Sequence, residues 1–280
     1  MFMLGLLSIL LSSPANAEEI KVGQVYQGGQ TLDISGLGVS FTIPNNWLGQ
    51  LDADGVILLG SNTEGGMLLV FGSKTTAQEV SAEFNTAIPI DETMALVPKG
   101  SPTLKDERIS IDYTVNVNGT PTPDAFGRLD GYVKNSGVGF GVLTVGATAD
   151  QANLLGKQKS LLTSVKFSAP KLPPQLVGCW LDTDSDFSEG FSFFSSTKIE
   201  LQANGQYRYT TKSSAGLTTN DSMGNWESDT TAENGNGTEV GTYFTIGNTL
   251  YLQSHDSERT FTFEYKNGVM YFHGTSYGNC

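Results

Sequence analysis

The chain has 280 residues, with 16 Lys and Arg against 29 Asp and Glu, and a formal net charge of −13 at pH 7. This balance excludes the usual basis of nucleic-acid binding, in which Lys and Arg replace the counterions of the phosphates, and it disfavours anionic lipid. Charged residues make up only 16% of the chain and 33 residues are glycine, a composition typical of short strands joined by many turns.

Residues 1–17 have the pattern of a secretory signal peptide. An apolar run from Met1 to Leu11 is followed by Pro14 and by the small residues Ala15-Asn16-Ala17, which predict cleavage after Ala17. The run is shorter than the roughly 20 residues that span a membrane, so no transmembrane anchor is expected. No Lys or Arg precedes it, and the alternative is a strand or helix of the mature fold. We expect an exported protein, periplasmic or extracellular.

Residues 18–168 mix strand and helix patterns and predict an α+β domain with an antiparallel sheet. Two Thr-x-x-(Glu/Gln) sequences, Thr76-Ala-Gln-Glu79 and Thr148-Ala-Asp-Gln151, predict capping boxes at the starts of two helices. The second helix would carry Leu154, Leu155, Leu161 and Leu162, which roughly follow helical spacing. Alternating apolar residues or short apolar runs predict strands at 39–43, 55–59, 67–71, 107–116, 126–134, 138–145 and 164–167.

Two segments of this domain resemble the PsbP/Mog1-like fold, which includes the periplasmic DcrB-like proteins. They are the strand Gly38-Val-Ser-Phe-Thr-Ile-Pro-Asn-Asn-Trp47 and the closing segment Leu161-Leu-Thr-Ser-Val-Lys-Phe167. The resemblance would cover the whole domain and implies its architecture. It implies no functional residue, because members share a fold and differ in what they bind.

Residues 169–174, which include Pro170, Pro173 and Pro174, predict an extended linker. Residues 175–280 then read as an all-β domain, with hairpin turns at Asn204-Gly205 and Asn267-Gly268. Gly178-Cys-Trp180, followed by Ala203-Asn-Gly-Gln-Tyr207, resembles the lipocalin-like small β-barrel, in which the Trp of the first strand closes the base. A β-sandwich is the alternative.

The two cysteines, Cys179 and Cys280, both belong to this second domain. An exported chain with an even pair favours a disulfide over two free thiols. A bridge that closes a loop of about a hundred residues would stabilise the fold by roughly 4.7 kcal/mol in the chain-entropy treatment.

Motifs for catalysis and cofactors are weak. His255 and His273 have no partner at metal spacing, and Gly137-Val-Gly139-Phe-Gly141 lies within a strand, where glycine relieves crowding, so no cofactor is expected. Asp182, Asp184 and Asp186 imitate the start of a calcium loop, although the later positions of that motif fail; a solvated acidic loop is the alternative.

Aromatic residues of the barrel are the main indication of a ligand. We expect them either to line a cavity or simply to fill the core. The sequence therefore predicts a non-enzymatic binding protein that holds a small apolar ligand in the barrel or docks an envelope partner. The alternatives are a glycan hydrolase that uses a pair such as Asp182 and Glu200, or an adhesive surface protein. The candidate ligand-binding residues are Trp180, Tyr207, Trp226, Phe261, Phe263 and Tyr265.

Overall fold

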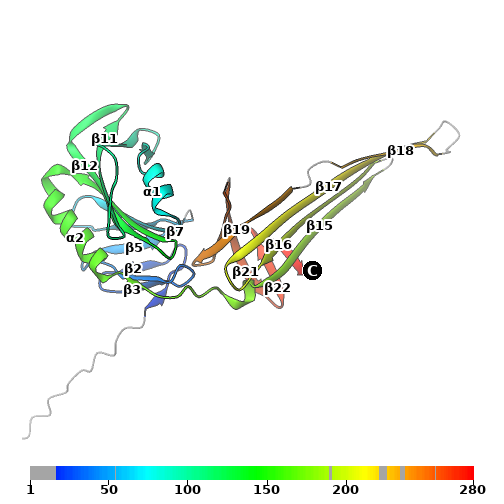
Figure 1. The fold of residues 1–280 in the computed structure, drawn as a ribbon, viewed down its shortest axis with the longest axis horizontal. Helices are drawn as coiled ribbons and strands as arrows, with labels where there is room; N and C mark the ends of the chain where they lie inside the picture. The colour runs from blue at the N-terminus through cyan, green and yellow to red at the C-terminus, as the bar shows by residue number, and fades with distance from the viewer. Residues whose placement is uncertain (1–16, 54, 189–190, 221–225, 234–236, 256) are drawn as a thin grey trace, which may run out of the picture.

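The chain folds into an α+β domain and a closed β-barrel in the computed structural model, which describes residues 17–53, 55–188, 191–220, 226–233, 237–255 and 257–280. Figure 1 shows the α+β domain on the left, the barrel beside it, and a long β arm that projects from the barrel. Residues 168–173 form neither helix nor strand and connect the two parts. No helix in the described part of the chain is both long and apolar enough to cross a membrane. The predicted signal peptide, apart from Ala17, lies outside the described residues.

The first domain is built on a large antiparallel sheet. The turn Asn118-Gly119, with both residues at positive φ, joins its two longest neighbouring strands as a tight hairpin. In spatial order the strands are β2 (Val25–Gln27), β5 (Leu48–Leu51), β6 (Ile57–Gly60), β7 (Met67–Lys74), β13 (Val138–Ala147), β12 (Thr120–Lys134), β11 (Arg108–Val117), β9 (Met94–Pro98) and β8 (Ile88–Pro89), with β10 (Thr103–Lys105) beside the start of β11.

A small second sheet and a helix cover one face of the large sheet. The sheet contains β1 (Glu18–Glu19), β3 (Thr31–Ile34), β4 (Val39–Thr42) and β14 (Lys166–Phe167), in that order. Helix α2 (Gln151–Ser164) packs beside it, and Leu154 and Leu161 are fully buried, as their spacing predicts. Together with one face of the large sheet they form the main apolar core.

Helix α1 (Ala77–Glu83) lies on the opposite face of the large sheet. The predicted capping box is confirmed: the Glu79 N–H donates to the Thr76 hydroxyl at 3.3 Å, and the Thr76 N–H donates to the Glu79 carboxylate at 2.7 Å. The second predicted box is wrong. A short 3-10 turn, η1 (Thr148–Asp150), precedes α2, and the Thr148 hydroxyl instead donates to the carbonyl of Pro123 at 3.2 Å.

The second domain is an antiparallel barrel of eight strands, and the pairing of β16 with β17 closes the ring. This confirms the barrel rather than a sandwich. A short turn, η2 (Pro174–Leu176), precedes it. The ring consists of β15 (Gly178–Ser188), β16 (Phe191–Leu201), β17 (Gln206–Asn220), β19 (Gly237–Ile246), β20 (Thr249–Gln253), β21 (Glu258–Lys266), β22 (Val269–Phe272) and β23 (Thr275–Asn279).

Strands β15, β16 and β17 continue beyond the barrel and, with β18 (Trp226–Glu233), form the projecting arm (Figure 1). The loop predicted for Asp182, Asp184 and Asp186 is therefore wrong, because all three lie in β15. Strand β23 pairs with β15 only at Trp180 and Leu181, so β15 is an edge strand from Asp182 onward. Charged residues at a sheet edge oppose pairing with other chains.

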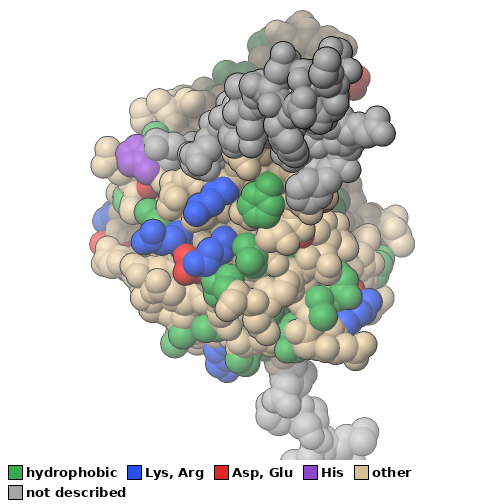
Figure 2. Space-filling view, turned by 90° about the vertical axis from the view of Figure 1, so that its right-hand side faces the viewer, with side chains coloured by type: hydrophobic (Ala, Val, Ile, Leu, Met, Phe, Trp, Pro, Cys, Tyr) green, Lys and Arg blue, Asp and Glu red, His purple; other side chains and the backbone are tan. Residues whose placement is uncertain are grey.

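On the side from which the arm projects, few of the visible side chains are acidic, and Lys and Arg gather in a small group (Figure 2).

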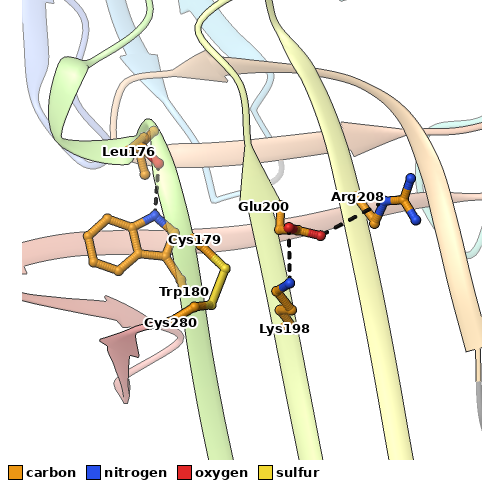
Figure 3. Close-up of a disulfide and its surroundings, with 7 residues drawn as sticks. All are labelled: Leu176, Cys179, Trp180, Lys198, Glu200, Arg208 and Cys280. Atoms are coloured by element: carbon orange, nitrogen blue, oxygen red, sulfur yellow. Dashed lines mark hydrogen bonds and ion pairs between the residues drawn. A yellow bond between two sulfur atoms is a disulfide. The ribbon is translucent and has the colours of Figure 1, made fainter.

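The base of the barrel is fixed by the predicted disulfide between Cys179 and Cys280, which is confirmed with a Cα–Cα distance of 5.4 Å (Figure 3). The bridge ties the last residue of the chain to β15. Next to it, Trp180 is buried inside the barrel, and its indole N–H donates to the carbonyl of Leu176 at 2.8 Å. The tryptophan thus lies at the base of the barrel, where the lipocalin-like resemblance implies it.

Candidate functional site

The two domains share one apolar core. Phe244, Ile246 and Tyr251 lie on the outer face of the barrel strands β19 and β20 and pack into the main core of the first domain. The rings of Phe244 and Tyr251 are stacked, with centroids 4.8 Å apart and planes 5° from parallel. Because this surface is apolar and buried from both sides, the two domains are held in one arrangement.

Glycine allows the two backbones to approach closely at this junction. A Cβ atom on Gly36 would lie 2.3 Å from the carbonyl oxygen of Thr245, and one on Gly247 would lie 2.8 Å from the carbonyl oxygen of Ile20. Real Cβ atoms do not come this close to other atoms, so a side chain at Gly36 or Gly247 would push the two backbones apart. The distance between the domains therefore depends on glycine at these two positions.

A cleft of about 1210 Å³ opens beside this contact, between α1, the large sheet and the barrel. Its floor consists of Phe71 and Ser73 of β7 with the neighbouring strand β13. Apolar side chains from both domains form its walls. They are Val80 and Phe84 of α1 and Phe244, Ile246 and Tyr251 on the outer face of the barrel.

Two glycines of the predicted strand motif shape the floor of the cleft. Gly141 is directly opposite Phe71, and Gly139 is directly opposite Ser73. A Cβ on Gly141 would lie 2.5 Å from the Phe71 ring, and one on Gly139 would lie 2.5 Å from the Thr75 methyl group. The interpretation of these glycines as relief of crowding is confirmed. Because they carry no side chain, the Phe71 ring and the Thr75 methyl group can pack directly on the backbone of β13.

The rim of the cleft carries several titratable groups. Burial lowers the pKa of the Lys74 ammonium. Burial, and then the negative charge of Glu258 on the barrel, raise the pKa of Glu83. The hydrogen bonds of the capping box lower the pKa of Glu79, and the charge of His255 acts in the same direction. Carboxylates from the two domains therefore face each other across the cleft, close to a half-buried lysine.

The aromatic residues predicted to bind a ligand lie in a different place. Trp180, Tyr207 and Phe263 are buried in the barrel core, and Phe261 packs against the same cluster. Tyr265 is 48% exposed and contacts the Trp180 ring edge-on, with centroids 6.3 Å apart. Trp226 lies in β18, and its side chain is outside the described part of the structure.

A polar network adjoins this aromatic core. The Tyr207 hydroxyl donates to the Glu239 carboxylate, and the Arg259 guanidinium binds the same carboxylate at 3.1 Å. Arg259 also lies over the Tyr209 ring at 4.8 Å. Burial, and then the hydrogen bond to Glu239, raise the pKa of Tyr207. The network thus links Tyr207 of β17, Glu239 of β19 and Arg259 of β21.

The proposed acid–base pair of a hydrolase does not form. Asp182 lies on the same face of β15 as the buried Trp180, whereas Glu200 is opposite Cys179 and points to the outer face. Glu200 binds Lys198 at 3.0 Å and approaches Arg208 at 3.9 Å (Figure 3). The two carboxylates are thus on opposite sides of the barrel wall.

Within the described residues, no three His, Cys, Asp or Glu side chains come together as they would around a metal ion. Alternate residues of an extended strand are about 6.6 Å apart, so the backbone at Asp182, Asp184 and Asp186 in β15 does not curl around one point as a calcium loop does. The two ring nitrogens of His273 are hydrogen-bonded, Nε2 to the carbonyl of Thr260 at 2.8 Å and Nδ1 to the hydroxyl of Thr262 at 3.2 Å.

Sequence reasoning did not identify the cleft, because its walls come from segments more than a hundred residues apart. The local signal was the pair of alternate glycines in β13, Gly139 and Gly141, whose missing side chains leave room for Thr75 and Phe71. Glycines within a strand indicate that another group approaches the backbone closely, but they do not reveal which group.

No protein-family model matches the chain, and no curated protein matches it either. Among solved structures, the solution structure of cyanobacterial PsbP (CyanoP) from Synechocystis sp. PCC 6803 is similar, with 16% sequence identity and a TM-score of 0.38. The match covers 56% of this chain and 99% of that chain. A similarity of this degree transfers no residue role, and the α+β class of the first domain follows from its own sheets and helices.

Proposed function

We propose that the protein is an exported, non-enzymatic binding protein that holds a small, mainly apolar ligand in the cleft between its two domains. The observation that carries the proposal is the cleft itself, about 1210 Å³ in volume and walled by apolar side chains from both domains. Ligand sites are concave, largely apolar and frequent at domain interfaces, and they usually measure about 300–1,000 Å³. The hydroxyl-bearing Ser73 on the floor of the cleft supplies one polar group to orient a ligand there.

The packing of the barrel supports the cleft over the barrel interior as the place for the ligand. Phe261 contacts Phe272 with ring centroids 5.9 Å apart, and Phe272 contacts Tyr277 at 5.0 Å. These rings fill space that an apolar ligand would need, and eight strands leave an interior that side chains can occupy completely. The lipocalin-like resemblance then describes the architecture, while the ligand lies outside the ring of strands.

Export is supported by the signal-like residues 1–17 and by the disulfide between Cys179 and Cys280, because such bridges persist mainly in oxidising compartments.

The projecting arm favours a second role, the docking of an envelope partner. Its four strands pair with one another beyond the ring of the barrel and offer a further surface for a partner. Shortening the arm should abolish cross-linking to such a partner while ligand binding persists.

The ligand proposal is tested with N-phenyl-1-naphthylamine, a neutral apolar fluorophore that gains fluorescence on leaving water. We expect saturable binding by the mature chain, and at least tenfold weaker binding after Ser73→Phe, which places a ring on the floor of the cleft. The matched control is Tyr209→Ala, which opens the barrel interior and should bind the dye as the natural chain does. Binding that is insensitive to Ser73→Phe and altered by Tyr209→Ala would contradict the proposal.

A further inference from the structure

A second concave surface lies on the first domain, beside helix α2. It is a groove of about 690 Å³ between α2 and the end of the large sheet formed by β10, β11 and β12. Helix α2 packs on β13, β4 and β12, whereas Lys105 on β10 and Arg108 on β11 are exposed. Four of the chain's 16 basic residues line this groove, against two of its 29 acidic residues. The basic residues are Lys105, Arg108, Arg128 and Lys159.

The strand register places the polar groups of the groove in two rows on one face of the sheet. Lys105 is opposite Arg108, and Arg108 is opposite Tyr132. Neighbouring strands are about 4.8 Å apart, so these three residues form a continuous row across the sheet. The adjacent row brings Thr103 beside Ser110, which places two hydroxyl groups next to the two cations. From the opposite wall, α2 contributes Lys159.

Only one of the four cations is neutralised. Arg128 binds both oxygens of Asp130, at 2.8 and 3.1 Å, and one oxygen of Asp112 at 3.2 Å. Lys105, Arg108 and Lys159 form no ion pair with any residue that the structure describes. Arg108 only rests its guanidinium over the Tyr132 ring at 5.4 Å.

We infer that this groove is a binding site for a small phosphate monoester with an apolar substituent. Lys and Arg with adjacent hydroxyl groups match the charge and the acceptor oxygens of phosphate. Leu155 and Leu162 of α2 line the same groove and supply an apolar wall for the substituent. Because the chain as a whole carries −13, an anion is repelled from most of the surface, and a site with three unpaired cations is where it would be retained.

The test is isothermal titration of the mature full-length chain with phenyl phosphate. We expect saturable binding, weaker binding of inorganic phosphate, and no binding of phenol. The variant K105Q/K159Q removes two unpaired charges from exposed side chains and should weaken phenyl phosphate at least tenfold. The matched control K198Q/K212Q removes the same charge from the outer face of β16 and β17 and should leave binding within about twofold.

Three results would overturn the inference. They are no heat from phenyl phosphate at millimolar concentration, equal weakening by both double variants, and phenol binding as tightly as phenyl phosphate. A second variant, Arg108→Met, keeps the contact with Tyr132 while it removes the charge, and it should also weaken binding at least tenfold. Circular dichroism melting of each variant shows that it is folded, so loss of binding cannot be ascribed to unfolding.

Discussion

Gly36 shows how a single residue sets the distance between the two domains. A Cβ at this position would lie 2.3 Å from a backbone oxygen of Thr245, and a backbone atom cannot move aside as the end of a side chain can. The absence of a side chain is thus a condition for burying Phe244 and Tyr251 against the first domain.

We predict that Gly36→Ala lowers the free energy of unfolding by about 1–3 kcal/mol, the usual effect of forcing extra volume into a packed contact. Urea denaturation monitored by tryptophan fluorescence measures the change. Gly60→Ala is the control, because a Cβ there meets no atom within 4 Å. Equal destabilisation by the two substitutions would show that the junction is not tightly packed at Gly36.

Glu19 makes stability depend on pH. Burial, and then the nearby charge of Asp33 on the adjacent strand, raise the pKa of Glu19 to about 7 from an ordinary value of 4.5, against a backbone hydrogen bond from Ser35 that lowers it. The folded state therefore holds a proton that the unfolded state releases. The stabilisation this gives is complete below pH 4.5 and is lost as the pH rises through 7.

We predict that the free energy of unfolding falls between pH 4.5 and pH 7.5 by on the order of 1–2 kcal/mol through this group, a figure discounted for solvent screening of a half-buried side chain. Glu19→Gln should remove that part of the fall, whereas Glu18→Gln should retain it. Urea titrations at the two pH values give the difference. An unchanged pH dependence in Glu19→Gln would exclude Glu19 as its source.

Among the elements, those with one buried face could be predicted from the sequence and those with two exposed faces could not. Strand β4 alternates Val39 and Phe41 inward, and α1 begins at a capping box, so both patterns reflect the fold directly. The segment Thr183-Asp184-Ser185 of β15 has no apolar alternation, and all three residues are exposed. In the sequence, the alternate aspartates of β15 therefore resemble a polar loop rather than a strand.

At the scale of this element, the aspartates of β15 have a predicted role. Asp184 is exposed on a strand edge that no other described strand covers. We expect Asp184→Val to increase self-association, because an apolar edge strand is a template for pairing with another chain. Sedimentation velocity should show at least a severalfold larger dimer fraction at the same concentration. Thr183→Val, which adds an apolar group on the other face without removing charge, is the control; equal association of the two variants would refute the role.

In the whole molecule, the site could be predicted far less well than the fold. Barrel, disulfide and α+β class follow from local patterns and from a pair of cysteines. The cleft depends on how Phe244 and Tyr251 of one domain are placed beside Phe71 and Gly141 of the other, and no local pattern encodes that arrangement. Aromatic residues of the barrel were the strongest ligand signal in the sequence, yet several of them form its core.

The central claim, that the ligand lies between the domains, is tested most directly by mapping amide shifts in a ¹⁵N-labelled sample during titration with N-phenyl-1-naphthylamine. The account predicts that the largest changes fall on Ser73, Gly139, Gly141 and Ser254, which line the cleft. Changes confined to Trp180, Phe261 and Phe263, with the cleft amides unmoved, would contradict it and return the ligand to the barrel.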